Sequence, residues 1–194
     1  MIRNALRALR AVVVLGLLTG LAYPLSITAI AQLTMSSKAD GSLIRVDGRV
    51  VGSSSIGQPW EGDRWFHGRP SSVDYDASTS SGSNLGPSSQ MLADLIEERA
   101  RAILELEGPY DPGLTVADIP VDLLTASASG LDPHISVAAA EFQAPRIATV
   151  RGLPLARVQD LIAEHTEEPA LGFFGQERVN VLELNLALER AVGR

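Results

Sequence analysis

Cysteine is absent from this chain of 194 residues, and lysine occurs once, as Lys38. The missing thiols exclude disulfides, thiolate nucleophiles, zinc ribbons and iron–sulfur clusters. A Walker-type phosphate loop needs a lysine directly after its glycines, whereas Lys38 follows two serines. A self-contained nucleotide site of that kind is therefore excluded.

Positive charge is scarce beyond the first 33 residues. Three of the 16 basic residues lie in residues 1–33, which hold no acid, so residues 34–194 carry 13 basic and 23 acidic side chains. The net charge of this part is -10. Binding of nucleic acid requires clustered cations to neutralise phosphates, so we expect no nucleic-acid partner.

Patterns that carry catalysis are missing as well. The chain has no Gly-x-Ser-x-Gly elbow, no Ser-x-x-Lys, and no pair of histidines at the i, i+4 spacing of a helical zinc site. Neighbouring acids such as Glu167 and Glu168 are typical of a solvated face. We therefore expect neither catalytic residues nor a metal site.

A charge-free stretch of 23 residues, Ala11–Leu33, is long enough to cross a bilayer as a helix. Arg3, Arg7 and Arg10 precede it, and the positive-inside rule then places the N-terminus in the cytoplasm. We predict a cytoplasmic segment at 1–10, a transmembrane helix at 11–33 and an extracytoplasmic domain at 34–194.

Two questions about this stretch stay open at the level of sequence. Ala29-Ile30-Ala31 also fits a signal-peptidase site, so the alternative is an acidic binding module secreted after cleavage at Ala31. The second question is whether the helix packs on another helix or stands alone in lipid. Small and hydroxyl side chains favour packing at four positions, namely Gly16, Thr19, Gly20 and Ser26.

The remaining pattern predicts a mixed fold of class α+β (irregular α/β), with a single exported domain after the transmembrane helix. We expect a hairpin at Ser42–Val51 that turns at Asp47-Gly48, and then loop structure over Gly52–Ser89. Further elements are predicted from periodicity, caps and prolines: a helix from Met91 to Gly108, a short buried strand at Val121–Thr125, helices after Ser136, over Pro145–Gly152 and over Pro154–His165, and a final helix capped by Asn180.

Two stretches rich in glycine and serine precede helices or follow the expected strand. Residues 80–87 lead into the Met91 helix and could form an anion nest, although no lysine accompanies them. Residues 125–136 fit a ligand loop or a tight turn, and His134 could titrate beside Asp132 or simply follow an Asp-Pro turn. General frequencies favour a structural turn.

Several ordered strings together resemble one family, the C subunit of the bacterial Kdp-type potassium-transporting ATPase (KdpC family). They are Gly57-Gln58, Phe66–Ser71, Ser81–Pro87, Asp122–Ser127, Ser129–Ser136 and Arg178–Asn185. The resemblance covers nearly the whole chain. It departs at Ala128, where a glycine is usual, and at Ser88-Ser89, where Asn-Pro is common.

The resemblance implies an accessory, non-catalytic subunit of a high-affinity potassium-uptake complex in the bacterial inner membrane. Its expected partners are a channel-like potassium-binding subunit and a P-type ATPase subunit, and ATP and K⁺ are handled by the complex. The family is described as a catalytic chaperone that raises the affinity of the ATPase subunit for ATP. Candidates for contact with a partner or ligand are the motif residues Arg69, Ser83, Asn84, Gly86, Ser127, Ser129, Gly130, Asp132 and His134.

Overall fold

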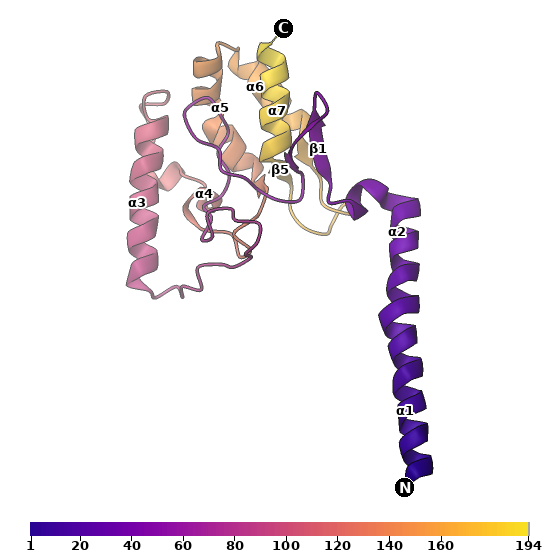
Figure 1. The fold of residues 1–194 in the computed structure, drawn as a ribbon. Coiled ribbons are helices and arrows are strands. Elements are labelled where there is room, and N and C mark those ends of the chain that lie inside the picture. Colours follow the sequence, from indigo (N-terminus) through magenta and orange to yellow (C-terminus); the bar gives the residue numbers. More distant parts are fainter. Residues whose placement is uncertain (194) are drawn as a thin grey trace. The chain divides into compact units, whose positions relative to one another are not determined.

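The computed structural model describes residues 1–193, which fall into two compact units, Met1–Val51 and the chain from Gly52 onward. The first unit begins with one long helix, formed by α1 (Ile2–Leu17), the π-helical turn η1 (Leu18–Ala22) and α2 (Tyr23–Ala39), with a kink at Met35 where the backbone is not helical. No residue of this helix is buried. Figure 1 draws it in indigo at the N-terminal end.

This helix is long and apolar enough to span a membrane, with an 18-residue stretch of mean hydropathy 1.9. It contains the predicted span 11–33 and extends beyond it at both ends. The hydroxyls of Thr19 and Ser26 donate to the carbonyls of Leu15 and Ala22, at 2.8 and 2.7 Å. These polar groups are therefore satisfied within their own helix.

The predicted hairpin is confirmed as β1 (Leu43–Val46) and β2 (Arg49–Ser53). Asp47 and Gly48 both have positive φ, at 49° and 77°, as a type I′ turn requires. Beyond β2 the chain runs to residue 89 without a further helix or multi-residue strand. The expectation of loop structure there is confirmed.

The core of the second unit lies between three helices and a small sheet. The helix α5 (Val137–Arg151) packs on α6 (Leu155–Glu164), which in turn packs on α7 (Val181–Val192). The antiparallel sheet has the order β3-β5-β4, with β3 at His134–Ile135, β4 at Thr166–Glu167 and β5 at Arg178–Asn180. Figure 1 shows β5 leading into α7.

The helix α3 (Gln90–Glu107) packs on α5 and on the short helix α4 (Val121–Leu124). The 3₁₀ turn η2 (Val116–Asp118) lies between α3 and α4 in the chain. The predicted cap of α7 is confirmed, since Asn180 accepts from the N–H of Glu183. Ser136 caps α5 in the same way, by accepting from the N–H of Ala139. The serine expected to cap the Met91 helix is Ser89, and its side chain makes no capping hydrogen bond. The expected mixture of helix and strand is also confirmed.

Two predicted elements are wrong. Val121–Thr125 is not a strand, because Pro120 starts a single helical turn that closes when the Thr125 N–H bonds to the Val121 carbonyl. The separate helices expected on either side of Pro145 form one helix, α5. Proline in a helix removes one hydrogen bond, and burial of the residues flanking Pro145 on this helix outweighs that loss.

Three buried side chains fasten the loop between β2 and α3 to the core. Asn185 accepts from the N–H of Phe66 and donates to its carbonyl, both at 2.9 Å. Gln143 makes the same pair of bonds with His67, at 2.8 and 3.2 Å. Arg146 donates to the backbone carbonyls of residues 63 and 65. We call Gln143, Arg146 and Asn185 the clasp.

Candidate functional site

An open pocket of about 520 Å³ lies beside the three-stranded sheet. Three of the predicted contact residues line it, namely Arg69, Asp132 and His134. They arrive from different places: Arg69 from the loop fastened by the clasp, Asp132 from the residues just before β3, and His134 from β3 itself. The fold thus brings together residues more than 60 positions apart.

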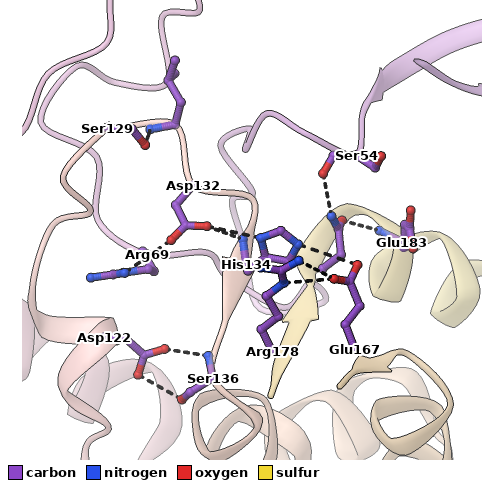
Figure 2. A network of polar contacts seen from close by, with 12 residues as sticks. Ser54, Arg69, Asp122, Ser129, Asp132, His134, Ser136, Glu167, Arg178 and Glu183 are labelled. Atoms are coloured by element: carbon purple, nitrogen blue, oxygen red, sulfur yellow. Dashed lines mark hydrogen bonds and ion pairs between the residues drawn. The ribbon is translucent and has the colours of Figure 1, made fainter. Parts of the chain in front are cut away.

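Acidic and basic side chains alternate along one side of this pocket (Figure 2). Arg69 pairs with Asp132 at 3.3 Å, and Nδ1 of His134 lies 3.4 Å from the other oxygen of Asp132. The chain of contacts continues from Nε2 of His134 to Glu167 at 3.8 Å, and from Glu167 to Arg178 at 2.8 Å. We call these five residues the charged cluster.

Pairing in the sheet explains the contact between Glu167 and Arg178 in the charged cluster. Glu167 of β4 stands directly opposite Arg178 of β5, and His134 of β3 stands opposite Asn180 of the same strand. Opposite charges at directly paired positions stabilise an antiparallel sheet. Spacing along the sequence does not reveal this pairing, so Glu167 and Arg178 were missed as members of the site.

The carboxyl of Asp132 is held ionised by its neighbours. Burial raises its pKa, but hydrogen bonds from the ring and backbone of His134 and the charge of Arg69 outweigh burial, so the pKa falls below its ordinary value. The negative charge of Asp132 also acts on the phenol of Tyr75. Burial raises the pKa of this phenol to about 12, and the Asp132 charge contributes to the rise. The Tyr75 hydroxyl donates to the carbonyl of Arg69 at 2.5 Å.

A second polar contact anchors the other wall of the pocket. Asp122 accepts from the backbone N–H of Ser136 at 2.7 Å and from its hydroxyl at 3.1 Å. The same hydroxyl oxygen caps α5 by accepting from Ala139. This serine therefore has a structural role at the start of the helix.

The turn at 127–130 packs on the loop that carries Arg69. Ser127 is buried and donates its N–H to the carbonyl of Pro70, while the carbonyl of Ser129 accepts from the N–H of Ser81. Gly130 has φ of +69°, and a Cβ there would lie 2.6 Å from Val73, so no larger residue fits without strain. These contacts give the tight structural turn that general frequencies favour.

The other predicted contact residues, Ser83, Asn84 and Gly86, are exposed and do not line the pocket. Whether any of the nine residues contacts a partner remains a prediction. Among residues 1–193 no group of three His, Asp or Glu side chains is arranged to hold a metal ion.

Asp132→Asn is expected to lower the free energy of unfolding by about 1–2 kcal/mol at pH 7, because it removes charged hydrogen bonds. A depressed folded pKa gives stability that is present above the unfolded pKa of roughly 4 and is lost as pH falls through the folded pKa. The difference from the native chain should therefore shrink toward pH 3.

Urea unfolding of the full chain in detergent, followed by tryptophan fluorescence, measures this. Both tryptophans, Trp60 and Trp65, lie in the second unit, so the helix in the micelle does not contribute to the fluorescence. Asp160→Asn, at an exposed acid on α6, is the control. A difference that stays constant from pH 7 to pH 3 would contradict the assignment.

Comparison with known proteins decides the family. The family model described as "K+-transporting ATPase, c chain" (KdpC) matches residues 5–190. The chain belongs to the KdpC family. This match includes the long helix from residue 5 onward and the whole of the described second unit except its last residues.

Individual KdpC proteins align over nearly their full lengths. The potassium-transporting ATPase KdpC subunit of Polaromonas naphthalenivorans is 54% identical, over 96% of this chain and 95% of its own. That of Bradyrhizobium diazoefficiens is 46% identical over 100% of both chains. The KdpC subunit of Sorangium cellulosum is 51% identical over 95% of this chain and 96% of its own. The family resemblance inferred from the sequence motifs is thus confirmed.

Proposed function

We propose that this chain is the accessory subunit of an ATP-driven potassium-uptake complex and has no catalytic residues of its own. The observation that carries the proposal is the unburied apolar helix Ile2–Ala39, in a chain that aligns end to end with KdpC subunits. Such a helix has no apolar surface of its own domain to cover, and a bilayer provides that environment. The chain is then a single-pass protein of the bacterial inner membrane.

Its partners are a channel-like potassium-binding subunit and a P-type ATPase subunit, which handle K⁺ and ATP. Within the membrane, Gly16 and Gly20 present a surface without side chains, since no atom lies within 4 Å of where their Cβ atoms would be. Close approach of a second helix uses such positions. The long helix therefore packs against a membrane-spanning partner.

Charge near the N-terminus supports an orientation with the N-terminus in the cytoplasm. Arg3, Arg7 and Arg10 lie ahead of the apolar stretch. The second unit is then periplasmic or extracellular, where it caps the outer mouth of the channel-like subunit. Its excess of acids favours cations near that mouth.

The proposed effect on ATP is indirect. A domain outside the cell meets no ATP, so the subunit stabilises the assembly and raises the affinity of the ATPase subunit for ATP through contacts with the other subunits. The alternative of a secreted module is less favoured. Its cleavage site at Ala29–Ala31 lies within the helical part of α2 that precedes the kink at Met35, and the family match begins at residue 5.

A single experiment on the cysteine-free chain tests this proposal. Tagged Ser83→Cys and Asn4→Cys chains, both altered at exposed positions, are produced with the two partner subunits. We expect a membrane-impermeant thiol reagent to label Ser83→Cys in intact cells and Asn4→Cys only after lysis. The purified chain should retain its N-terminus and carry both partners, and the KM for ATP should rise when the chain is omitted.

Each result has an outcome that contradicts the proposal. Labelling of Ser83→Cys only after lysis would overturn the orientation. A soluble product that begins at Gln32 would overturn the membrane role. An unchanged KM would overturn the effect on ATP affinity.

A further inference from the structure

The hairpin between β4 and β5 exposes an unusual amount of apolar surface. Residues 169–176 carry no charge, and three large side chains within them stand in solvent. Leu171 is 83% exposed, Phe173 70% and Phe174 60%. The two phenylalanine rings lie 4.2 Å apart between centroids. We call these three residues the apolar tip.

The backbone holds the apolar tip in a defined shape. Ala170 and Phe174 exchange both backbone hydrogen bonds at 2.9 Å, which closes a three-residue loop. Leu171 sits in the left-handed region at φ +56°, followed by Gly172 at +79°. A residue with a Cβ costs roughly 1–2 kcal/mol in that region. This strained backbone presents a leucine outward instead of toward the core.

The apolar tip contributes nothing to the core of its own domain. Val179, two positions into the adjoining strand β5, is fully buried, so the sheet itself is well packed. Contiguous apolar side chains on a rigid projection are typical of sites that bind another molecule. Aromatic side chains in particular supply the central contacts of protein interfaces.

Charge around the apolar tip distinguishes a protein from a lipid surface as its partner. Glu168 and Glu177 flank it and are exposed, and the nearest basic side chain, Arg178, is paired with Glu167 at 2.8 Å. Segments that insert into bilayers typically carry Lys and Arg beside their apolar residues, because anionic lipids repel acids. Acidic flanks instead complement a protein pocket with basic residues at its rim.

We propose that the apolar tip inserts into an apolar pocket with a basic rim on the outer face of the membrane subunit that the domain covers. This inference rests on the proposed function and names the surface through which the subunit acts. The short connection supports it, since only residues 40–42 and the β1–β2 hairpin join the long helix to the second unit. A partner held at the membrane is therefore within reach.

Photocrosslinking tests the contact directly. p-Benzoylphenylalanine replaces Phe173 in the full chain, produced together with both partner subunits, and the same analogue at exposed Met91 of α3 is the control. We expect a crosslink from position 173 to the outer face of the channel-like subunit, located by mass spectrometry. A crosslink to lipid, or none in an intact complex, would overturn the inference.

Substitution measures how much the contact contributes. We expect Phe173→Ser/Phe174→Ser to retain about tenfold less chain in the detergent-solubilised complex, and Met91→Ser/Val116→Ser to leave retention unchanged. Glu168→Lys/Glu177→Lys should also reduce retention of the chain, because its lysines then face the basic rim of the pocket. This reduction should grow as the salt concentration is lowered, because salt screens the repulsion. Equal retention of the two double-serine variants would overturn the inference.

Failure of this inference is distinguishable from failure of the proposed function. If the native chain purifies without either partner subunit, the proposed function fails and the docking inference falls with it. If the native complex forms but position 173 crosslinks only to lipid, the accessory-subunit role stands and the apolar tip is a membrane contact.

Discussion

Arg146→Met is expected to lower the free energy of unfolding of the second unit by about 3–5 kcal/mol, since it leaves a buried charge without its partner. Arg146 is fully buried and bonds to Glu107 at 2.9 Å and to Gln143 at 3.0 Å. It also donates to the carbonyls of Asp63 and Trp65. Urea unfolding of the full chain in detergent, followed by tryptophan fluorescence, gives the loss.

The pH dependence of this variant identifies the unpaired charge. Burial raises the pKa of the Glu107 carboxyl, and the charge and hydrogen bond of Arg146 oppose that rise. Without the guanidinium the pKa rises further. Between its unfolded and folded pKa values such a carboxyl binds more protons when folded, so stability increases as pH falls. The deficit of Arg146→Met should shrink as pH is lowered from 7.

Two further variants separate the effect of the buried charge from the effect of the hydrogen bonds that Arg146 donates to backbone carbonyls. Glu107→Met/Arg146→Met should recover part of the loss, because no charge is then left buried. It should not recover all of it, because the carbonyls of residues 63 and 65 still lack their donor. Arg157→Met, at an exposed ion pair on α6, should cost less than about 1 kcal/mol. Similar losses for Arg146→Met and Arg157→Met would contradict the role of the clasp.

Helices and turns of this protein were predictable where their cause is local. Asn180 caps α7 through a residue three positions away, and Asp47-Gly48 sets the β1–β2 turn by its own backbone preference. A long apolar stretch likewise predicts the N-terminal helix, which is long and apolar enough to span a membrane, without reference to any other part of the chain. These features depend on contacts within a few residues.

Elements that depend on distant contacts were not predictable. The strands β3, β4 and β5 have two or three residues each, too few to show an alternating pattern. Only their mutual pairing makes them strands. The predicted strand at Val121–Thr125 is wrong for a related reason, since Leu123 and Leu124 reach the core equally well from a helical turn.

The candidate site divides in the same way. Asp132 and His134 are close in sequence, and their neighbourhood was a reasonable prediction. Pairing of Arg69 with Asp132 required the clasp to fix the loop, and the pairing of Glu167 with Arg178 required the sheet. The family motifs included Arg69 and Arg178 without indicating what either one contacts.

Asn185→Leu is expected to cost about 3 kcal/mol, because it leaves the buried N–H and carbonyl of Phe66 without partners. Leucine is close to asparagine in size, so little volume is lost in the core. Urea unfolding measures the loss, and hydrogen exchange should show that the Phe66 amide is no longer protected. Arg190→Leu, at an exposed position on the same helix, is the control and should change stability by less than about 0.5 kcal/mol.

Asn185→Ala then distinguishes hydrogen bonding from packing. If the two bonds to Phe66 hold the loop, alanine and leucine should cost similar amounts, since both remove the amide and only alanine adds a small cavity. If filling the core matters more, leucine should be tolerated and alanine should not. Because the same loop carries Arg69 to Asp132, a loop released by Asn185→Leu should also lose the pH-dependent stability that Asp132 contributes. That coupling would connect the clasp in the core to the charged cluster at the surface.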